Sequence, residues 1–135
     1  MPKDVKTFLA LGALSAAASL LLGAAAAHGP NAPTAASLAL FQTALQYHQF
    51  HALGLMMVGL IAARLPPSRW LSASGWLMIV GTLLFSGNLY LRSLLDFHAL
   101  HRLTPFGGGA FIVAWLLLAV GVMRRRGGDW GASRL

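Results

Sequence analysis

The sequence predicts an all-α integral membrane protein, a bundle of four transmembrane helices with both termini in the cytoplasm. Three observations lead to this prediction: four apolar stretches that can cross a bilayer, a composition too apolar for water, and basic residues at one end of these stretches. The chain has 135 residues, of which 57% are hydrophobic and 10% are charged, whereas soluble proteins carry about 25% charged residues. We therefore expect a single domain, 1–135, surrounded by lipid.

Each predicted span has about 20 apolar residues, the length at which a helix crosses a hydrocarbon layer and pairs its own backbone groups. The first stretch, 8–27, has no charged residue, and the second, 44–63, ends before an arginine and two prolines. The third is 70–91, and the fourth is 106–123, which ends before three arginines. Aromatic residues that anchor span ends at the membrane interface are expected at Trp70, Tyr90 and Trp130.

The basic residues predict the orientation, because short cytoplasmic loops carry the excess of Lys and Arg. One side of the four-span arrangement collects Lys3, Lys6, Arg64, Arg69, Arg124, Arg125, Arg126 and Arg134. The other side has Arg92 and Arg102, and no Lys or Arg lies in the connection between the first two spans. We therefore expect a multi-pass protein whose termini are both cytoplasmic.

The composition excludes several classes of function. The chain has no Cys, so disulfides, thiolate nucleophiles and cysteine-based zinc sites cannot form. Its acidic residues are Asp4, Asp96 and Asp129, which leaves little basis for paired-carboxylate catalysis. The formal net charge of +7 comes from basic residues that are single or at the ends of apolar stretches. Since they form no basic stripe along a polar helix, no nucleic acid partner is expected.

A cleavable signal peptide is the alternative interpretation of the first stretch. Lys3 and Lys6 precede an apolar core, and an alanine-rich segment follows it, as in a signal peptide. Cleavage after Ala27 would make His28 a new N-terminus able to chelate copper. The apolar core of about 20 residues is longer than the roughly 7 to 15 residues of a signal peptide, so we expect a retained helix.

Polar residues are expected to gather at the outer face. With a rise of about 1.5 Å per residue, His28 lies about 30 Å from Phe8 along the first helix, and His51 lies about 20 Å from Arg64 along the second. Both positions fall on the side opposite the termini. The candidate polar site at this face comprises His28, Gln42, Tyr47, His51, Ser86, Asn88, Tyr90 and Thr104.

The histidines raise the alternative of a metal or haem site. His48 and His51 are three residues apart and so share one face of a helix. Neutral imidazole suits Zn, Cu and haem iron, and the candidate ligands are His28, His48, His51, His98 and His101. The competing interpretation is that these rings hydrogen-bond across helices or face interfacial water. We expect no cofactor, with Cu, Zn or haem as the alternative.

Glycines recur in the spans and predict close approach of the helices, since small residues let membrane helices pack tightly. Those in the second and third spans are Gly54, Gly59, Gly75, Gly81 and Gly87. In segment 104–109, Thr104 can cap the fourth helix, Pro105 fits its first turn, and three glycines permit tight packing. These glycines could instead cradle an anion at the helix start, but the lysine of a phosphate loop is absent.

Several motifs, in order along most of the chain, resemble one family of proteins. They are His28 after an alanine run, Phe41-Gln42-Thr43-Ala44 with Tyr47 and His51, segment 81–90, Thr104-Pro105-Phe106-Gly107-Gly108, and Trp115. The chain is similar to the YgdD-like proteins, a family of small bacterial inner-membrane proteins with a domain of unknown function. The resemblance implies a four-helix membrane fold and an inner-membrane location, and it implies no reaction.

The chain departs from this family at two motifs. Its residues 24–28 are Ala-Ala-Ala-Ala-His where the family has Gly-Ala-Phe-Gly-Ala-His, and it has Asn88 where the family commonly has Ser. His48, His98 and His101 match none of the motifs, so a site of five histidines would be particular to this chain.

Three functions are open at this point. The first is a non-enzymatic structural or accessory component that packs against a larger membrane complex or against its own copies. The second is a binding or transport module whose outer polar pocket holds a metal ion, a haem or a quinone, since intramembrane polar groups are often functional. An enzyme would depend on Ser86 with His51, and no carboxylate in the spans could orient that histidine. We therefore expect no enzymatic activity.

Overall fold

The computed structural model describes residues 3–29 and 32–129, and over these ranges it is all-helical, without a strand. This confirms the predicted fold class. The elements are α1 (Lys3–His28), α2 (Ala35–Arg64), α3 (Arg69–Gly81), the π-helix η1 (Thr82–Gly87), α4 (Asn88–Leu95), the 3-10 turn η2 (His101–Leu103), α5 (Thr104–Met123) and the 3-10 turn η3 (Gly127–Asp129). Trp130 and Arg134, named above for the interface and the orientation, lie outside the described residues.

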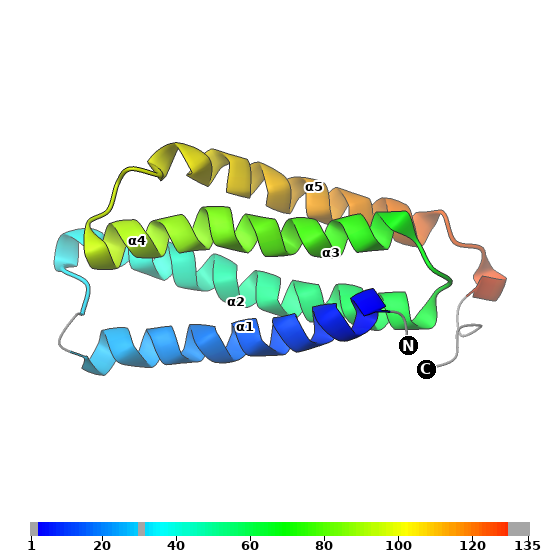
Figure 1. Cartoon of the computed structure of the whole chain (residues 1–135), viewed down its shortest axis with the longest axis horizontal. Coiled ribbons are helices and arrows are strands. Elements are labelled where there is room, and N and C mark those ends of the chain that lie inside the picture. Colours follow the sequence, from blue (N-terminus) through cyan, green and yellow to red (C-terminus); the bar gives the residue numbers. More distant parts are fainter. Residues whose placement is uncertain (1–2, 30–31, 130–135) are drawn as a thin grey trace.

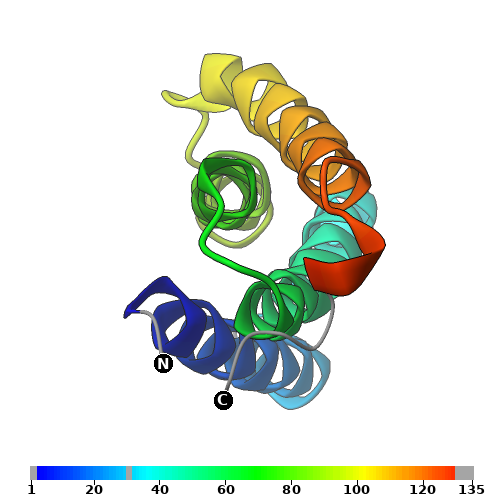
Figure 2. The same cartoon turned by 90° about the vertical axis from the view of Figure 1, so that its right-hand side faces the viewer.

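The helices form an elongated bundle in which neighbours along the chain run antiparallel (Figure 1). The segments α3, η1 and α4 make one continuous rod, which packs against α5 and α2, and α1 lies along α2 (Figures 1 and 2). The start of α1, the connection between α2 and α3, and the end of α5 lie at the same end of the bundle. We call this the terminal end, and the opposite end the loop end.

The helices are longer than the predicted spans, because they continue past the bounds predicted for the apolar stretches. The largest difference is in α2, which begins at Ala35 rather than near residue 44. The side chain of Thr34 accepts a hydrogen bond from the N–H of Ser37 and so caps this early start. The expected cap at Thr104 is wrong: Thr104 is the first residue of α5, and Leu103 precedes it without a side-chain cap. Pro105 is in the first turn, as predicted.

The π-helix interrupts the α-helical hydrogen bonds in the middle of the third rod. Past it, the backbone N–H of Asn88 donates to the carbonyl of Phe85, three residues back. The carbonyl of Leu84, which that N–H would reach in an α-helix, accepts the side-chain amide of Asn88 at 3.0 Å instead. The side-chain amide of Asn88 therefore bonds to the backbone within this irregular segment.

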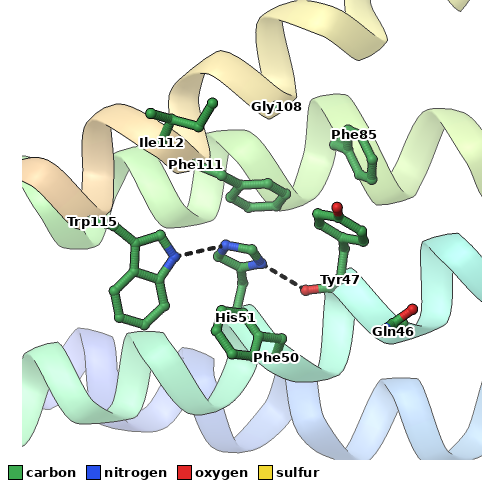
Figure 3. A pocket seen from close by; sticks show the side chains of 9 residues that line it. All are labelled: Gln46, Tyr47, Phe50, His51, Phe85, Gly108, Phe111, Ile112 and Trp115. Atoms are coloured by element: carbon green, nitrogen blue, oxygen red, sulfur yellow. Dashed lines mark hydrogen bonds between the residues drawn. The ribbon is translucent and has the colours of Figure 1, made fainter.

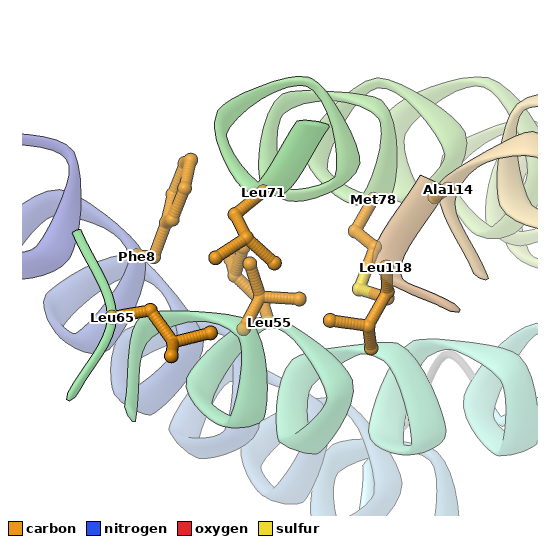
Figure 4. Packing of buried hydrophobic residues seen from close by; sticks show 8 residues of the cluster. Phe8, Leu55, Leu65, Leu71, Met78, Ala114 and Leu118 are labelled. Carbon is orange, nitrogen blue, oxygen red and sulfur yellow. The ribbon is translucent and has the colours of Figure 1, made fainter. Parts of the chain in front are cut away.

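The core lies toward the terminal end and joins all four rods (Figure 4). Its buried members are Phe8, Leu55, Val58, Leu65, Leu71, Met78, Ala114 and Leu118. Phe8 is 0% exposed, and its ring meets Trp76 edge-on at 5.6 Å. A Cβ on Gly75 would lie 2.3 Å from this ring. The predicted packing role of Gly75 is thereby confirmed, and α1 belongs to the core.

Three described helical segments are long and apolar enough to cross a membrane: Asp4–His28, Arg69–Leu95 and His101–Met123. Exposed side chains along them include Leu14, Leu20, Leu21, Leu83, Ile112 and Leu116, as expected where lipid rather than water is the solvent. Helix α2 is not among these segments. It is long enough, at 30 residues or about 45 Å, but carries Gln42, Gln46, His48, Gln49 and His51.

Candidate functional site

The two histidines of α2 point into the bundle rather than toward its surface. His48 is 7% exposed and His51 is 3% exposed. His51 lies 13 residues before Arg64, or about 20 Å along the helix from its terminal end. The polar chemistry of the chain is therefore concentrated within the bundle, where each unsatisfied polar group would be costly.

Both ring nitrogens of His51 are engaged in hydrogen bonds (Figure 3). The indole N–H of Trp115 on α5 lies 3.1 Å from Nε2 of His51. Because an indole N–H can only donate, Nε2 must accept this bond, and the ring proton is on Nδ1. Nδ1 then donates to the carbonyl of Tyr47, 2.8 Å away. His51 is therefore held as one neutral tautomer that joins α2 to α5.

The ring of His51 is also stacked. It lies against Phe111 of α5 with ring centroids 3.5 Å apart and an angle of 11° between the planes. Tyr47, one turn earlier on α2, meets Phe85 of η1 with centroids 4.6 Å apart. These contacts bring α2, η1 and α5 together around one aromatic cluster.

A cavity of about 540 Å³ opens beside this cluster, between α2, η1 and α5 (Figure 3). Its lining is Gln46, Tyr47, Phe50, His51, Phe85, Gly108, Phe111, Ile112 and Trp115. Phe50 is 59% exposed and Ile112 is 64% exposed, so the cavity opens sideways on the surface that faces lipid. Flat apolar walls with Gln46 and Tyr47 at the rim suit a ring-bearing lipophile. We call this the aromatic cavity.

His48 makes a second set of bonds, which joins three rods. Nδ1 lies 2.8 Å from the hydroxyl of Tyr90 on α4, and Nε2 lies 2.8 Å from the hydroxyl of Ser15 on α1. Hydroxyls both donate and accept, so a neutral imidazole satisfies both partners in either tautomer. A second cavity, of about 420 Å³, is lined by apolar residues of α1, α2, α3 and η1 and by the polar residues Ser15, His48, His51, Thr82, Ser86 and Tyr90.

Two serines add contacts between helices. Ser86 of η1 donates to the carbonyl of Ala44 on α2 at 2.9 Å, and Ser74 of α3 donates to the carbonyl of Ala114 on α5 at 2.7 Å. Both serines are 0% exposed. Because the hydroxyl of Ser86 is committed to a backbone carbonyl, it forms no nucleophile and base pair with His51 in this structure.

The structure brings together only part of the polar site predicted from the sequence. Tyr47 and His51 meet at the aromatic cavity, and His51, Ser86 and Tyr90 line the second cavity with His48. The remaining four residues, His28, Gln42, Asn88 and Thr104, line neither cavity. Within the described ranges, Oδ1 of Asn88 and Oγ1 of Thr104 are buried without a hydrogen-bond partner.

The five histidines do not converge. His28, His98 and His101 are exposed, and Nε2 of His98 lies 2.6 Å from the Asp96 carboxylate in the connection before η2. His101 donates through Nδ1 to the carbonyl of His98 at 2.8 Å. Over residues 3–29 and 32–129, no three His, Asp or Glu side chains are grouped as metal ligands. The donors that a Zn or Cu site would need are thus dispersed in the described part of the chain.

Sequence reasoning missed the α5 half of the aromatic cavity. Phe111 and Trp115 are four residues apart on a helix and so share one face, which was the available signal for them. Trp115 entered the sequence analysis only through the family resemblance. Ser15, the partner of His48, has no sequence signal, because one serine among the alanines of α1 looks like ordinary small-residue packing.

Fold and site together define a multi-pass α-helical membrane protein whose buried polar side chains join its helices. The profile of a family described as "Protein of unknown function (DUF423)" matches residues 22–108, so the chain belongs to that family. It is 39% identical over 121 residues to the UPF0382 membrane protein YwdK of Bacillus subtilis, an alignment that covers 89% of this chain and 98% of that protein.

Other relatives carry the same kind of name. A UPF0382 membrane protein of Haemophilus influenzae is 38% identical over 120 residues, covering 88% of this chain and 95% of the relative. A UPF0382 membrane protein of Staphylococcus saprophyticus is 37% identical over 122 residues, covering 89% and 99%. No solved structure matches the chain. The similarity thus spans nearly the whole length of these membrane proteins.

Proposed function

We propose that the protein is a non-enzymatic component of a membrane assembly, in which its intramembrane histidines hold the helices together. The observation that carries this proposal is the engagement of all four ring nitrogens of His48 and His51 with side chains or carbonyls of the bundle. A general base needs a ring nitrogen within reach of a substrate proton. Here each such nitrogen already has a structural partner.

The distribution of acidic residues supports the same proposal. Asp4 accepts a hydrogen bond from Ser72 at the terminal end, and Asp96 pairs with His98 at the loop end. Neither carboxylate contacts His48 or His51, whereas a histidine in a catalytic triad is oriented by a buried carboxylate. An accessory role requires no such group, and no metal or haem is required by it either.

The membrane placement that we propose is the bacterial inner membrane, with four crossings and both termini in the cytoplasm. The described basic residues support it: Lys6, Arg64, Arg69, Arg124, Arg125 and Arg126 are at or near the terminal end, and Arg92 and Arg102 are near the loop end. Helix α2 lies along α1 and would cross with it, with His48 and His51 turned to the other helices. The narrower assignment to the YgdD-like proteins is part of this proposal.

The partner is proposed to be a larger membrane complex or further copies of the chain. Most of the glycines predicted to pack between helices already lie against side chains within the bundle. An added Cβ would meet Trp115 at Gly54, Leu9 at Gly59 and Phe111 at Gly81. A Cβ on Gly109 would meet nothing within 4 Å. The start of α5, beside the aromatic cavity, therefore keeps a small-residue surface on which another membrane helix could pack closely.

The test is the mass of the particle that the protein forms at its natural abundance. A tagged copy expressed from its own locus would be extracted with its lipids by a polymer that needs no detergent, and its mass measured by light scattering. We expect a particle that contains more than one protein chain. A particle with a single copy and no other protein would overturn the proposal.

A second candidate function, the binding of a quinone or another neutral ring-bearing lipophile, is favoured by the aromatic cavity. Gly108 lines this cavity, and Gly109 does not. Gly108→Leu fills the cavity, whereas Gly109→Leu adds the same side chain outside it. We expect mass spectrometry of an organic extract to find one ring-bearing lipid per chain in the wild type and G109L, and little in G108L. Equal amounts in all three proteins, or none, would exclude this function.

A further inference from the structure

Two arginines from different helices meet over one tryptophan at the terminal end of the bundle. The guanidinium carbon of Arg69, at the start of α3, lies 5.3 Å from the ring centroid of Trp70, and that of Arg124, at the end of α5, lies 5.0 Å from it. Both distances are within the range of cation–π attraction. The ring therefore holds two positive charges close together.

A third arginine completes a hollow around this ring. Nη2 of Arg125 donates to the carbonyl of Pro67 at 3.0 Å, which ties the end of α5 to the connection between α2 and α3. The hollow has a volume of about 270 Å³ and is lined by Pro67, Ser68, Arg69, Trp70, Arg124 and Arg125. We call it the arginine hollow. Its floor includes the first turn of α3, where N–H groups lack carbonyl partners within the helix and the helix dipole is positive.

The charge of the arginine hollow is not neutralised by the described part of the chain. Among the side chains that the structure describes, no carboxylate forms an ion pair with Arg69, Arg124 or Arg125, and the ion pair of His98 with Asp96 lies at the opposite end. Asp4 is at the terminal end, where its carboxylate accepts a hydrogen bond from Ser72. Positive charges that are held together in this way favour an anion from outside the chain.

The position of the arginine hollow identifies the source of that anion. It lies where α3 begins and α5 ends, at the limit of two of the apolar segments that can cross a membrane. Farther along the same two helices, Trp76, Val80, Leu116 and Met123 are exposed apolar side chains. A phospholipid presents a phosphate at the membrane interface and acyl chains along such a surface.

We propose that the arginine hollow binds the phosphate of an anionic phospholipid. Guanidinium groups bind phosphate oxygens through paired hydrogen bonds, and the tryptophan fits the interfacial depth of a head group. The bound lipid bridges α3, α5 and the connection before α3. This inference does not depend on the proposed accessory function, because it concerns the lipid around the chain and not a protein partner.

The test measures lipid adducts of the full chain by native mass spectrometry. Phosphatidylglycerol or phosphatidylcholine with the same acyl chains is added to the detergent-solubilised wild-type protein. We expect the anionic lipid to bind and the zwitterionic lipid to bind more weakly. Glycerol 3-phosphate, the soluble head-group fragment, is expected not to displace the bound lipid at an equal concentration. Equal binding of the two lipids, or displacement by the soluble fragment, would overturn the proposal.

Two double variants then locate the site. Replacing a basic residue near an anionic lipid surface weakens binding roughly fivefold, so R69Q/R124Q should lose about 25-fold in affinity for phosphatidylglycerol. The matched control, R64Q/R102Q, removes the same charge from arginines that do not line the hollow, and it should bind like the wild type. Equal losses in the two variants would show that net charge alone attracts the lipid and would refute the assigned site.

Discussion

The indole N–H of Trp115 donates to Nε2 of His51 across 3.1 Å, which joins α5 to α2 inside the bundle. The bond fixes the tautomer of His51 and leaves neither of its ring nitrogens free. From the sequence, His51 was a candidate ligand or general base. In the structure, its side chain is part of the packing between helices.

The first prediction concerns the strength of this bond. A double-mutant cycle with Trp115→Phe and His51→Phe should give a coupling free energy of about 0.6 kcal/mol and at most about 1.7 kcal/mol, the range of hydrogen bonds between membrane helices. The measurement is the free energy of unfolding in bicelles. A parallel cycle with Trp76→Phe, which lies beside Phe8 rather than His51, should show no coupling. Equal coupling free energies in the two cycles would mean that the coupling between Trp115 and His51 does not come from this hydrogen bond.

The second prediction concerns the bridge made by His48. Tyr90→Phe and Ser15→Ala each remove one of its partners, and each should lower the free energy of unfolding by about 1 kcal/mol, because a buried ring nitrogen loses its hydrogen bond. Tyr47→Phe is the control, since the Tyr47 side chain is 41% exposed at the rim of the aromatic cavity. Thermal unfolding in the same detergent compares the three variants, and a Tyr90→Phe variant as stable as Tyr47→Phe would contradict the bridge.

Hydrophobicity and charge were sufficient to predict the fold class, because span length and apolar composition are properties of local sequence. The helix bounds were less accurate: Ala35 to Thr43 belong to α2 although the predicted span began at residue 44. The π-helix at Thr82–Gly87 has no local signature, since it depends on how η1 packs against α2 and α5.

Only part of the candidate site was predicted, because spacing along one helix is a property of local sequence and contacts between helices are not. Helical spacing placed His48 and His51 on one face, and in the structure both are buried. Three of their four partners, Ser15, Tyr90 and Trp115, come from 33 to 64 positions away along the chain, and such pairings are fixed by the packing of the bundle. Counting residues along a helix predicts how far a side chain lies from the helix end, but not which way it points around the helix axis. His28 and Gln42 were therefore grouped with residues of the two cavities, although they line neither cavity.

The third prediction uses two glycines of α5 that are two residues apart. A Cβ on Gly107 would lie 2.5 Å from the backbone nitrogen of Phe85, whereas a Cβ on Gly109 would meet nothing within 4 Å. Gly107→Ala should therefore destabilise the bundle by about 1 to 3 kcal/mol, the cost of overpacking. Gly109→Ala should be neutral or stabilising by up to about 1 kcal/mol, because alanine favours a helix. Equal stability of the two variants would refute the close approach of α5 to η1.

The fourth prediction tests the proposed orientation and the crossing by α2. Because the chain has no Cys, the unsubstituted protein is an unlabelled control for single-cysteine variants. Ala35→Cys and Ala99→Cys, both exposed at the loop end, should react with an impermeant thiol reagent in cells whose cytoplasmic membrane is intact. Pro67→Cys and Gly128→Cys, exposed at the terminal end, should react only after that membrane is permeabilised. Labelling of Ala35→Cys and Pro67→Cys from the same side would show that α2 does not cross, and reversal of all four would show the opposite orientation.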